Sequence, residues 1–477
     1  MIRLRPSGAD EVLIKRVRDW YEPGPGVFIA PQALFNPALL FTTGVNGAWY
    51  DPSDFSTLFQ DAAGTTPVTA MEQPVGLMLD KSSRGNHAFN PSGNSANFPV
   101  LSARYNLLTK TEDFSDAAWE KGVNVSVTQN TLEVTDPQGT YTSAKFNSAG
   151  TSGAAFVRQV FTIPLIAHTG RVLVRKGNYR YFGLRVVNND PSSGDYVVLD
   201  FDANGGNGGI VYVPASENVS YSFTKLGEWF EFTVTNLPNA SPRYFQIGIS
   251  DASGLEAPTV PANSFVYVWH PDLRVSNDAL NQPAYQRVNT ATDYDTVGFK
   301  PYLKFNGTNQ WLQTNSIDFS YGDKMFVCAG VRKLSDAATG VIAEFSTTTA
   351  TNNGSFFVAA PIASLTSYRF ESKGTVISFS SSPVATYPAP ITNVLSGIGN
   401  ISGDQAILRA NGAQAAISTS DQGTGNYGNY QLYIGARAGS SLWFNGRLHQ
   451  LVVAGKEASA SEIGQTEAFV NQKTGAY

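Results

Sequence analysis

The chain has 477 residues and a formal net charge of −5. At about 150 residues per domain, this length predicts two or three domains. Charged residues make up only 15% of the chain, against roughly 25% in an average globular protein. The 33 basic residues are outnumbered by 38 acidic ones, so we expect no polyanion-binding surface and no nucleic-acid partner.

The first segment covers residues 1–45. It has charges near its start and no apolar core of the kind a secretory signal needs. Prolines interrupt the apolar stretch and forbid one continuous helix; they are Pro23, Pro25, Pro31 and Pro37. The apolar residues 27–41 have no local partner. We predict an arm that docks on another protein or on symmetry mates, and an N-terminal edge strand is the alternative.

From residue 47 onward the sequence alternates short apolar or aromatic runs with Gly- and Asn-rich turns. This pattern predicts strands spaced as in β-sandwiches or jelly rolls. The predicted strands are 171–176, 181–188, 196–202, 229–235, 244–250, 265–270, 302–307, 325–333, 340–346, 354–360, 368–372, 405–412, 431–438 and 448–455. No apolar run reaches 18 residues, so we expect no membrane insertion.

One helix is predicted, over residues 459–475 near the C-terminus. Ser459 or Ser461 can cap its start, and Gly475 can end it. The fold class is therefore all-β, with a short C-terminal helix.

Metal and thiol chemistry find little support in the sequence. Cys328 is the one cysteine, which excludes an intrachain disulfide and a cysteine-based zinc site, and its apolar surroundings predict a buried strand thiol. The four histidines lack metal-binding spacing; they are His87, His168, His270 and His449. We expect no cofactor, although calcium stays open, with Asp200 and Asp202 as candidate ligands because they share one face of a strand. The alternative roles of this pair are solvated turn acids or a catalytic pair.

The C-terminal part resembles a known family. Residues 302–314 read YLKFNGTNQWLQT, and residues 432–470 carry LYIGARAGSSLWFNGRLHQLVVAG followed by SASEIG. Both resemble the concanavalin A-like, laminin-G-type jelly roll of bacterial and phage proteins. Residues 47–101, which begin GAWYD, resemble the lead-in of the same domain. Its opening strand starts only at Tyr302, about 200 residues later, so we infer an inserted domain.

The insert resembles the carbohydrate-binding-like jelly rolls of phage head-spike and tail-fibre proteins. The resemblance rests on YNLLTKTEDFSDAAWEK (105–121), GEWFEFTVT (227–235) and FVYVWHPDLRV (265–275). The predicted division is therefore residues 1–45 as a virion-attachment arm, 46–104 with 296–477 as the lectin-like sandwich, and 105–295 as the inserted jelly roll with its exit linker.

These resemblances imply a structural protein of a phage particle, a tail fibre or a head fibre. They imply assembly in the bacterial host cytoplasm and a final place on the virion surface, on tail or head. The implied partners are other virion proteins, bound through residues 1–45, and host-surface polysaccharide. Such fibres are usually homotrimers, which is the oligomeric state that we expect.

Glycan binding needs exposed aromatic rings, on which sugars stack, and polar side chains that bind hydroxyls. The candidate residues are Tyr427, Asn429, Tyr430, Arg437 and Trp443 in the lectin-like part, and Tyr179, Arg180 and Tyr181 in the insert. Packing in the core or at a subunit interface is the alternative role for Tyr427 and Tyr430, and Trp443 could plug the sandwich edge. We expect Trp119, Trp229 and Trp311 to lie in the core.

An enzyme is the competing interpretation. Retaining glucanases on this fold use Glu-x-Asp-x-Glu on one strand, because alternate residues share a face, and this motif is absent from the sequence. Glu228 and Glu231 would face opposite sides of a strand, and Asp293 and Asp295 fall in the linker. We therefore predict a non-enzymatic adhesin. A capsule or lipopolysaccharide depolymerase and a purely structural decoration protein remain the alternatives.

Overall fold

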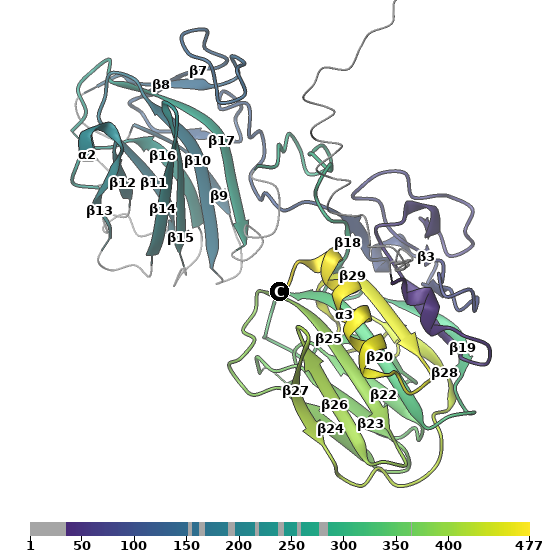
Figure 1. Ribbon diagram of the computed structural model, residues 1–477. Coiled ribbons are helices and arrows are strands. Elements are labelled where there is room, and N and C mark those ends of the chain that lie inside the picture. The colour runs from purple at the N-terminus through teal and green to yellow at the C-terminus, as the bar shows by residue number, and fades with distance from the viewer. Residues whose placement is uncertain are drawn as a thin grey trace, which may run out of the picture. The chain divides into compact units, whose positions relative to one another are not determined.

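The structure of the chain is a computed structural model (Figure 1). It describes residues 35–150, 155–161, 167–188, 196–214, 219–236, 243–254, 259–275, 285–363 and 365–477. The chain divides into residues 1–36 and a compact unit of residues 37–477. The described residues form antiparallel sheets and a C-terminal helix, so the predicted all-β fold is confirmed.

The first two sheets form what we call the terminal sandwich, built from strands before residue 103 and after residue 301. Sheet A has the order β27-β26-β25-β20-β29-β18-β5, and β1 also pairs with β29. Its strands are β1 (Gly47–Tyr50), β5 (Val100–Ser102), β18 (Tyr302–Asn306), β20 (Lys324–Lys333), β25 (Ile391–Asn400), β26 (Gln405–Ala410), β27 (Ala413–Ser418) and β29 (Asn445–Ala454).

Sheet B has the order β2-β3-β4-β19-β28-β21-β22-β23-β24. Its strands are β2 (Leu58–Phe59), β3 (Leu77–Met78), β4 (Ala88–Phe89), β19 (Leu312–Asp318), β21 (Val341–Phe345), β22 (Ser355–Ala359), β23 (Arg369–Lys373), β24 (Ile377–Ser381) and β28 (Asn429–Ile434). Three short 3₁₀ turns accompany the strands: η1 (Pro37–Leu40), η2 (Phe55–Thr57) and η3 (Ser95–Asn97).

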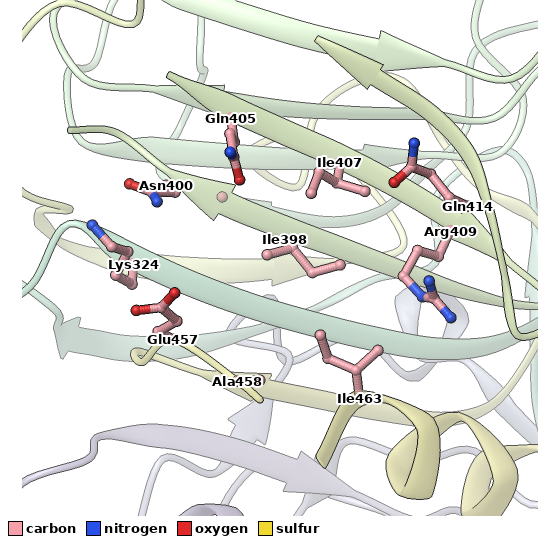
Figure 2. Close-up of a pocket in the computed structure, with 11 residues that line it drawn as sticks. Lys324, Ile398, Asn400, Gln405, Ile407, Arg409, Gln414, Glu457, Ala458 and Ile463 are labelled. Carbon is pink, nitrogen blue, oxygen red and sulfur yellow. The ribbon is translucent and has the colours of Figure 1, made fainter. Parts of the chain in front are cut away.

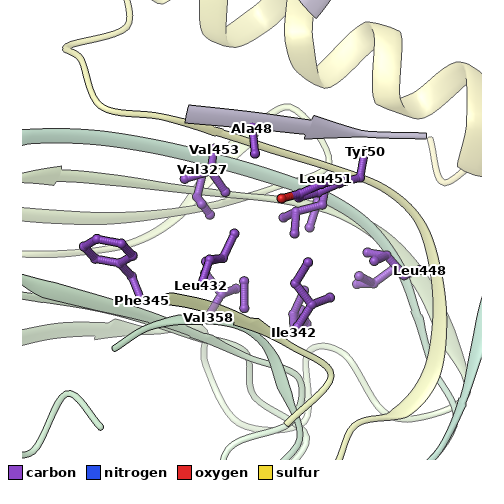
Figure 3. Packing of buried hydrophobic residues seen from close by; sticks show 14 of the residues in the cluster. Ala48, Tyr50, Val327, Ile342, Phe345, Val358, Leu432, Leu448, Leu451 and Val453 are labelled. Carbon is purple, nitrogen blue, oxygen red and sulfur yellow. The ribbon is translucent and has the colours of Figure 1, made fainter. Parts of the chain in front are cut away.

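The core of the terminal sandwich lies between sheets A and B. Alternate residues of each strand face inward, so Val327 and Leu451 of sheet A meet Phe345 and Leu432 of sheet B in one buried cluster (Figure 3). The single cysteine, Cys328, lies on the other face of β20 and is fully buried, as predicted, and burial raises the pKa of its thiol to about 12.

The predicted helix is confirmed as α3 (Ala460–Thr474). Ser459 caps its start: the Ser459 hydroxyl accepts from the Glu462 amide while the Glu462 carboxylate accepts from the Ser459 amide. Gly475 ends the helix in the left-handed conformation, with φ 60°. The helix packs on the outer face of sheet A, where Gly330 leaves room for Val470.

The other two sheets form the inserted sandwich. Sheet C has the order β13-β12-β11-β16-β9-β6, and sheet D has the order β14-β15-β10-β17-β8-β7. The strands are β6 (Glu120–Lys121), β7 (Val125–Thr128), β8 (Ala144–Ser148), β9 (Phe156–Phe161), β10 (His168–Lys176), β11 (Tyr181–Asn188), β12 (Val197–Asp200), β13 (Gly209–Tyr212), β14 (Val219–Leu226), β15 (Trp229–Asn236), β16 (Arg243–Ile249) and β17 (Phe265–Val275), and the short α2 (Ala203–Gly206) follows β12.

A separate hydrophobic cluster fills the inserted sandwich. Trp119 is 1% exposed and packs against Phe114 and Phe245. Trp229, in this sandwich, and Trp311, in the terminal one, are also buried, so all three tryptophans predicted to be core residues are confirmed.

The chain leaves the terminal sandwich and returns to it at neighbouring points. β5 and β18 are antiparallel partners, with Ser102 opposite Tyr302. The fully buried Gln286 side chain joins the two connections: its Oε1 accepts from the amides of Tyr105 (2.7 Å) and Asn106 (2.9 Å), and its Nε2 donates to the Ala103 carbonyl (2.8 Å). The described strands between β5 and β18 all belong to sheets C and D.

The predicted arm, residues 1–45, is too long at its C-terminal end. Leu40 and Phe41 are buried, and Arg84 donates to the carbonyls of Phe41 (2.7 Å) and Thr42 (2.6 Å). Residues 37–45 thus belong to the terminal sandwich because their apolar side chains find partners there. Residues 1–34 lie outside the described residues, and their docking role stays a prediction. No helix of the described residues is long and apolar enough to cross a membrane.

Candidate functional site

The turn between β10 and β11 carries the candidate residues of the inserted sandwich. We call residues 176–181 the tyrosine turn. The Asn178 side chain fixes it to the start of β17, because its Oδ1 accepts from the Phe265 amide (2.8 Å) and its Nδ2 donates to the Asn263 carbonyl (2.9 Å). Gly177 is required here, since a Cβ at this position would collide with the Phe265 ring.

The two tyrosine rings of this turn lie next to each other. The ring centroids of Tyr179 and Tyr181 are 6.1 Å apart at an angle of 77°. Both side chains are half-buried, and desolvation, followed by the nearby Asp251 carboxylate, raises the pKa of Tyr179. The rings are therefore partly held by packing while part of each surface faces solvent, as sugar stacking requires.

Fixed charges flank the rings. The Arg180 guanidinium binds Asp200 through two hydrogen bonds of 2.7 Å, and Lys176 lies 2.5 Å from Asp202. The hydrogen bonds that Arg180 donates to the Asp200 carboxylate raise the pKa of Arg180. The tyrosine turn thus combines two rings with donors and acceptors in set positions, and their role in glycan binding stays a prediction.

The two candidate calcium ligands are the same aspartates. Although burial opposes it, hydrogen bonds from Arg180 and from the Asp202 amide lower the pKa of Asp200, whose carboxylate is thereby occupied by a cation of the chain itself. The described residues contain no group of three or more His, Cys, Asp or Glu side chains that could hold a metal ion. The structure therefore gives calcium at this position no support.

In the terminal sandwich, Tyr427 is not placed for stacking. Its ring is 1% exposed and packs against Phe356, and its hydroxyl lies 2.6 Å from the Ser372 Oγ. Desolvation raises the pKa of Tyr427 well above the usual range. The prediction of an exposed ring is wrong for this residue, because the Gly-rich loop turns it into the space above Gly399, which has no side chain. Of the two roles weighed for Tyr427, packing fits.

Tyr430 and Asn429 lie at the start of β28. The Tyr430 ring makes an edge-to-face contact with Phe345, with centroids 5.5 Å apart, and its hydroxyl donates to the Asn353 carbonyl (3.0 Å). Asn429 is exposed. Tyr430 thus also contributes to packing, although it is only half-buried.

Arg437 lies over the outer face of sheet B, whereas Tyr427 packs in the core on the inner side of this sheet. Its Nε donates to Glu344 (2.8 Å), and its guanidinium sits 5.1 Å from the centre of the Phe357 ring. Trp443 is half-buried beside the pair formed by Trp311 and Tyr433. The five candidates of the terminal sandwich therefore do not form one site.

Sequence reasoning missed the buried carboxylate beneath Arg437. Glu344 is 0% exposed, and desolvation raises its pKa although Arg437 opposes the shift. The Thr349 amide donates to Glu344 (2.9 Å) and the Thr349 hydroxyl to Glu371 (2.9 Å), so Thr349 occupies the space between the carboxylates. The sequence feature that could have predicted this buried carboxylate is a glutamate within the otherwise apolar strand pattern GVIAEFS.

The acidic pairs considered for catalysis are separated or neutralised. Asp293 and Asp295 both accept from the Arg287 guanidinium, at 3.0 and 3.1 Å. Glu228 is exposed in the turn before β15, whereas Glu231 lies within the strand, opposite Leu173 of β10.

No protein-family model matches this sequence, and neither does any curated protein. Several solved structures are similar over about a third of the chain. The CBM40 of the Ruminococcus gnavus IT-sialidase, also solved with sialyllactose, is 16% identical with a TM-score of 0.27, covering 35% of this chain and 96% of that one.

A heptameric SAP-like pentraxin from Limulus polyphemus is 14% identical with a TM-score of 0.28, covering 34% of this chain and 78% of that one. The receptor-binding domain of botulinum neurotoxin mosaic serotype C/D is 12% identical with a TM-score of 0.29, covering 36% and 43%. Scores this low carry no argument about ligand or activity.

Proposed function

We propose that this chain is a non-enzymatic structural protein of a phage particle that binds host-surface polysaccharide. The observation that carries the binding role is the tyrosine turn, in which two half-buried rings lie beside the ion pairs of Arg180 with Asp200 and Lys176 with Asp202. Partly exposed rings suit the apolar face of a sugar, and flanking charged groups suit its hydroxyls.

The virion role rests on the resemblance of residues 47–475 to phage fibre and spike proteins. We infer that residues before Pro37 attach the protein to the particle, at tail or head, and that the particle presents a homotrimer. Three copies would turn weak single sites into strong overall binding, because linked sites raise avidity by roughly 10²–10⁴ without new contacts. Light scattering should then give three times the chain mass of 51.3 kDa.

The binding test is light-scattering chromatography of host-surface polysaccharide with and without the purified protein. We expect the polysaccharide to elute with the protein at higher mass. Tyr181→Ala and Tyr179→Ala should each weaken this binding about tenfold, because a ring that stacks on a sugar contributes on the order of 1 kcal/mol or more.

The matched control is Tyr221→Ala, which removes a ring that is 45% exposed on β14 of the same sandwich. This change should leave binding intact. Equal losses in all three variants would contradict the role of the tyrosine turn. Shortened polysaccharide chains after overnight incubation would contradict the non-enzymatic role, and absence of any effect would favour a structural decoration protein.

A further inference from the structure

A pocket of about 220 Å³ lies on the outer face of sheet A, beside the start of α3 (Figure 2). Its floor is apolar: Ile398 of β25 lies opposite Ile407 of β26, and Ile463 of α3 closes one side. All three isoleucines are half-buried, so each keeps part of its surface open to the pocket.

Polar rows border this floor on both sides. One row contains Lys324, Asn400 and Gln405, which are register partners across three strands. The other contains Arg409 and Gln414, again partners across two strands. Because the rows are two residues before and after the isoleucines along the strands, each lies about 7 Å from the apolar row. Figure 2 shows this order of polar, apolar and polar side chains.

The cations of the pocket already have partners within the chain. Arg409 binds the buried Glu467 carboxylate through two hydrogen bonds of 2.8 and 3.0 Å. Lys324 lies 2.8 Å from Asp323 and 3.0 Å from the Ser402 hydroxyl. A strongly anionic ligand would therefore have to compete with these bonds, so the pocket suits a neutral one.

The groups left for a ligand are exposed amides and one carboxylate. Within the described part of the chain, the side chains of Gln405, Gln414 and Glu457 make no hydrogen bond. A side-chain amide both donates and accepts, which is also what a sugar hydroxyl does. The backbone groups of β20, β25 and β26 are bound in the sheet ladder on both sides, so an extended peptide could add as a strand only at the edge strand β27 and not on the pocket floor.

We propose that this pocket binds one neutral sugar residue of a glycan, with the apolar ring face on the isoleucine floor and the hydroxyls on the amide rows. The pocket is smaller than the 300–1,000 Å³ typical of drug-sized ligands, which fits a single ring. It lies in the terminal sandwich and shares no residue with the tyrosine turn. The pocket and the site of the proposed function have in common only that both would bind glycans.

The test follows the isoleucine methyl groups of the full chain by NMR while neutral monosaccharides (glucose, galactose, mannose, N-acetylglucosamine) are added to millimolar concentrations. We expect at least one sugar to shift the Ile398, Ile407 and Ile463 signals in a saturable way. In the double variant Gln405→Ala with Gln414→Ala, the affinity should fall on the order of tenfold, because it loses amide hydrogen bonds.

The matched control is Gln465→Ala, which removes an exposed amide of α3 outside the pocket and should leave the titration unchanged. The proposal is overturned if no neutral sugar shifts these methyl groups, or if the shifts persist undiminished in the double variant. Loss of host-polysaccharide binding in the Tyr181→Ala variant with intact methyl shifts would show that the two sites are independent. Intact methyl shifts without any host-polysaccharide binding would overturn the proposed function alone.

Discussion

The hydrogen bond between Tyr427 and Ser372 joins a loop to β23 inside the terminal sandwich. Both residues are at most 1% exposed, so neither hydroxyl can replace its partner by water. An unpaired buried polar group costs about 1–3 kcal/mol. This bond therefore fixes the Gly-rich loop before β28, although the loop composition alone favours exposure.

Tyr427→Phe should lower the free energy of unfolding by about 1–2 kcal/mol, since it leaves the Ser372 hydroxyl unpaired in the core. Tyr430→Phe is the control: it removes a hydroxyl bonded to the Asn353 carbonyl in an exposed position and should cost less. Urea unfolding of both variants measures the difference. An equal decrease in the free energy of unfolding in both variants would contradict the conclusion that burial makes the Tyr427 hydrogen bond the more important one.

The buried His449 makes the stability of the terminal sandwich depend on pH. Burial, followed by the nearby Arg447 and Arg332 cations, lowers the pKa of His449 to about 3. An unfolded histidine has a pKa of about 6.5, so the unfolded state binds more protons between these values. The contribution of His449 to the free energy of unfolding is therefore fully present above about pH 6.5, and it is lost as the pH falls toward 3.

When the pH falls from about 7 to 5, the free energy of unfolding should decrease in both proteins. The decrease should be about 2 kcal/mol smaller in His449→Gln than in the wild type. Gln465→Ala, a change at an exposed residue without a titratable group, should follow the wild-type pH profile. Urea unfolding at the two pH values checks both expectations. Parallel profiles for the wild type and His449→Gln would show that His449 takes up no proton on unfolding.

At the scale of elements, α3 is the one whose bounds follow most directly from local sequence. Its start and end depend on a serine cap, a glutamate three residues later and a terminal glycine, all of which act within a few residues. Its position on sheet A depends on distant residues, because Gly330 of β20 must leave space for Val470 and Thr474.

Two substitutions in α3 should have opposite effects on thermal stability. Ser459→Ala removes the cap and should cost about 1 kcal/mol. Gly464→Ala should stabilise the helix by up to about 1 kcal/mol, since an added Cβ meets nothing within 4 Å. Calorimetry of the two variants measures the shifts. A loss of stability in Gly464→Ala would contradict this account of the helix surface.

β25 shows why one central strand was not predicted. Its sequence ITNVLSGIGN is rich in small and polar residues, which resemble a loop. In the folded chain, Gly397 receives the ring of Phe370 from β23, and Gly399 receives the hydroxyl of Tyr427 from the loop before β28. The strand is therefore completed by side chains from distant segments, and no local pattern reveals this.

At the scale of the whole molecule, the inserted sandwich should be removable. The chain passes Asn106 and Gln286 at adjacent points, because the Gln286 Oε1 binds the amide of Asn106. Replacing residues 107–284 by a short Gly-rich turn would keep the Tyr105, Tyr294 and Phe299 cluster that supports the connection. Loops whose ends lie close together tolerate such exchanges.

We expect the shortened chain to unfold in one cooperative thermal transition and to keep the isoleucine pocket of Figure 2. The same deletion in a Gln286→Ala background is the sensitive control, because it removes the buried amide that holds both connections and should cost about 2 kcal/mol or more. A shortened chain that fails to fold would contradict the predicted division into residues 46–104 with 296–477 and residues 105–295.

The sequence by itself determined the all-β class, the C-terminal helix, the buried tryptophans and the tyrosine turn, because alternation, capping and turn residues act over short distances. Only the tertiary structure decided the rest. It buried Tyr427, paired Asp200 with Arg180, and placed Ile398, Ile407 and Ile463 in one pocket. Each of these depends on residues far apart in the chain, which meet only when strands pair and sheets pack.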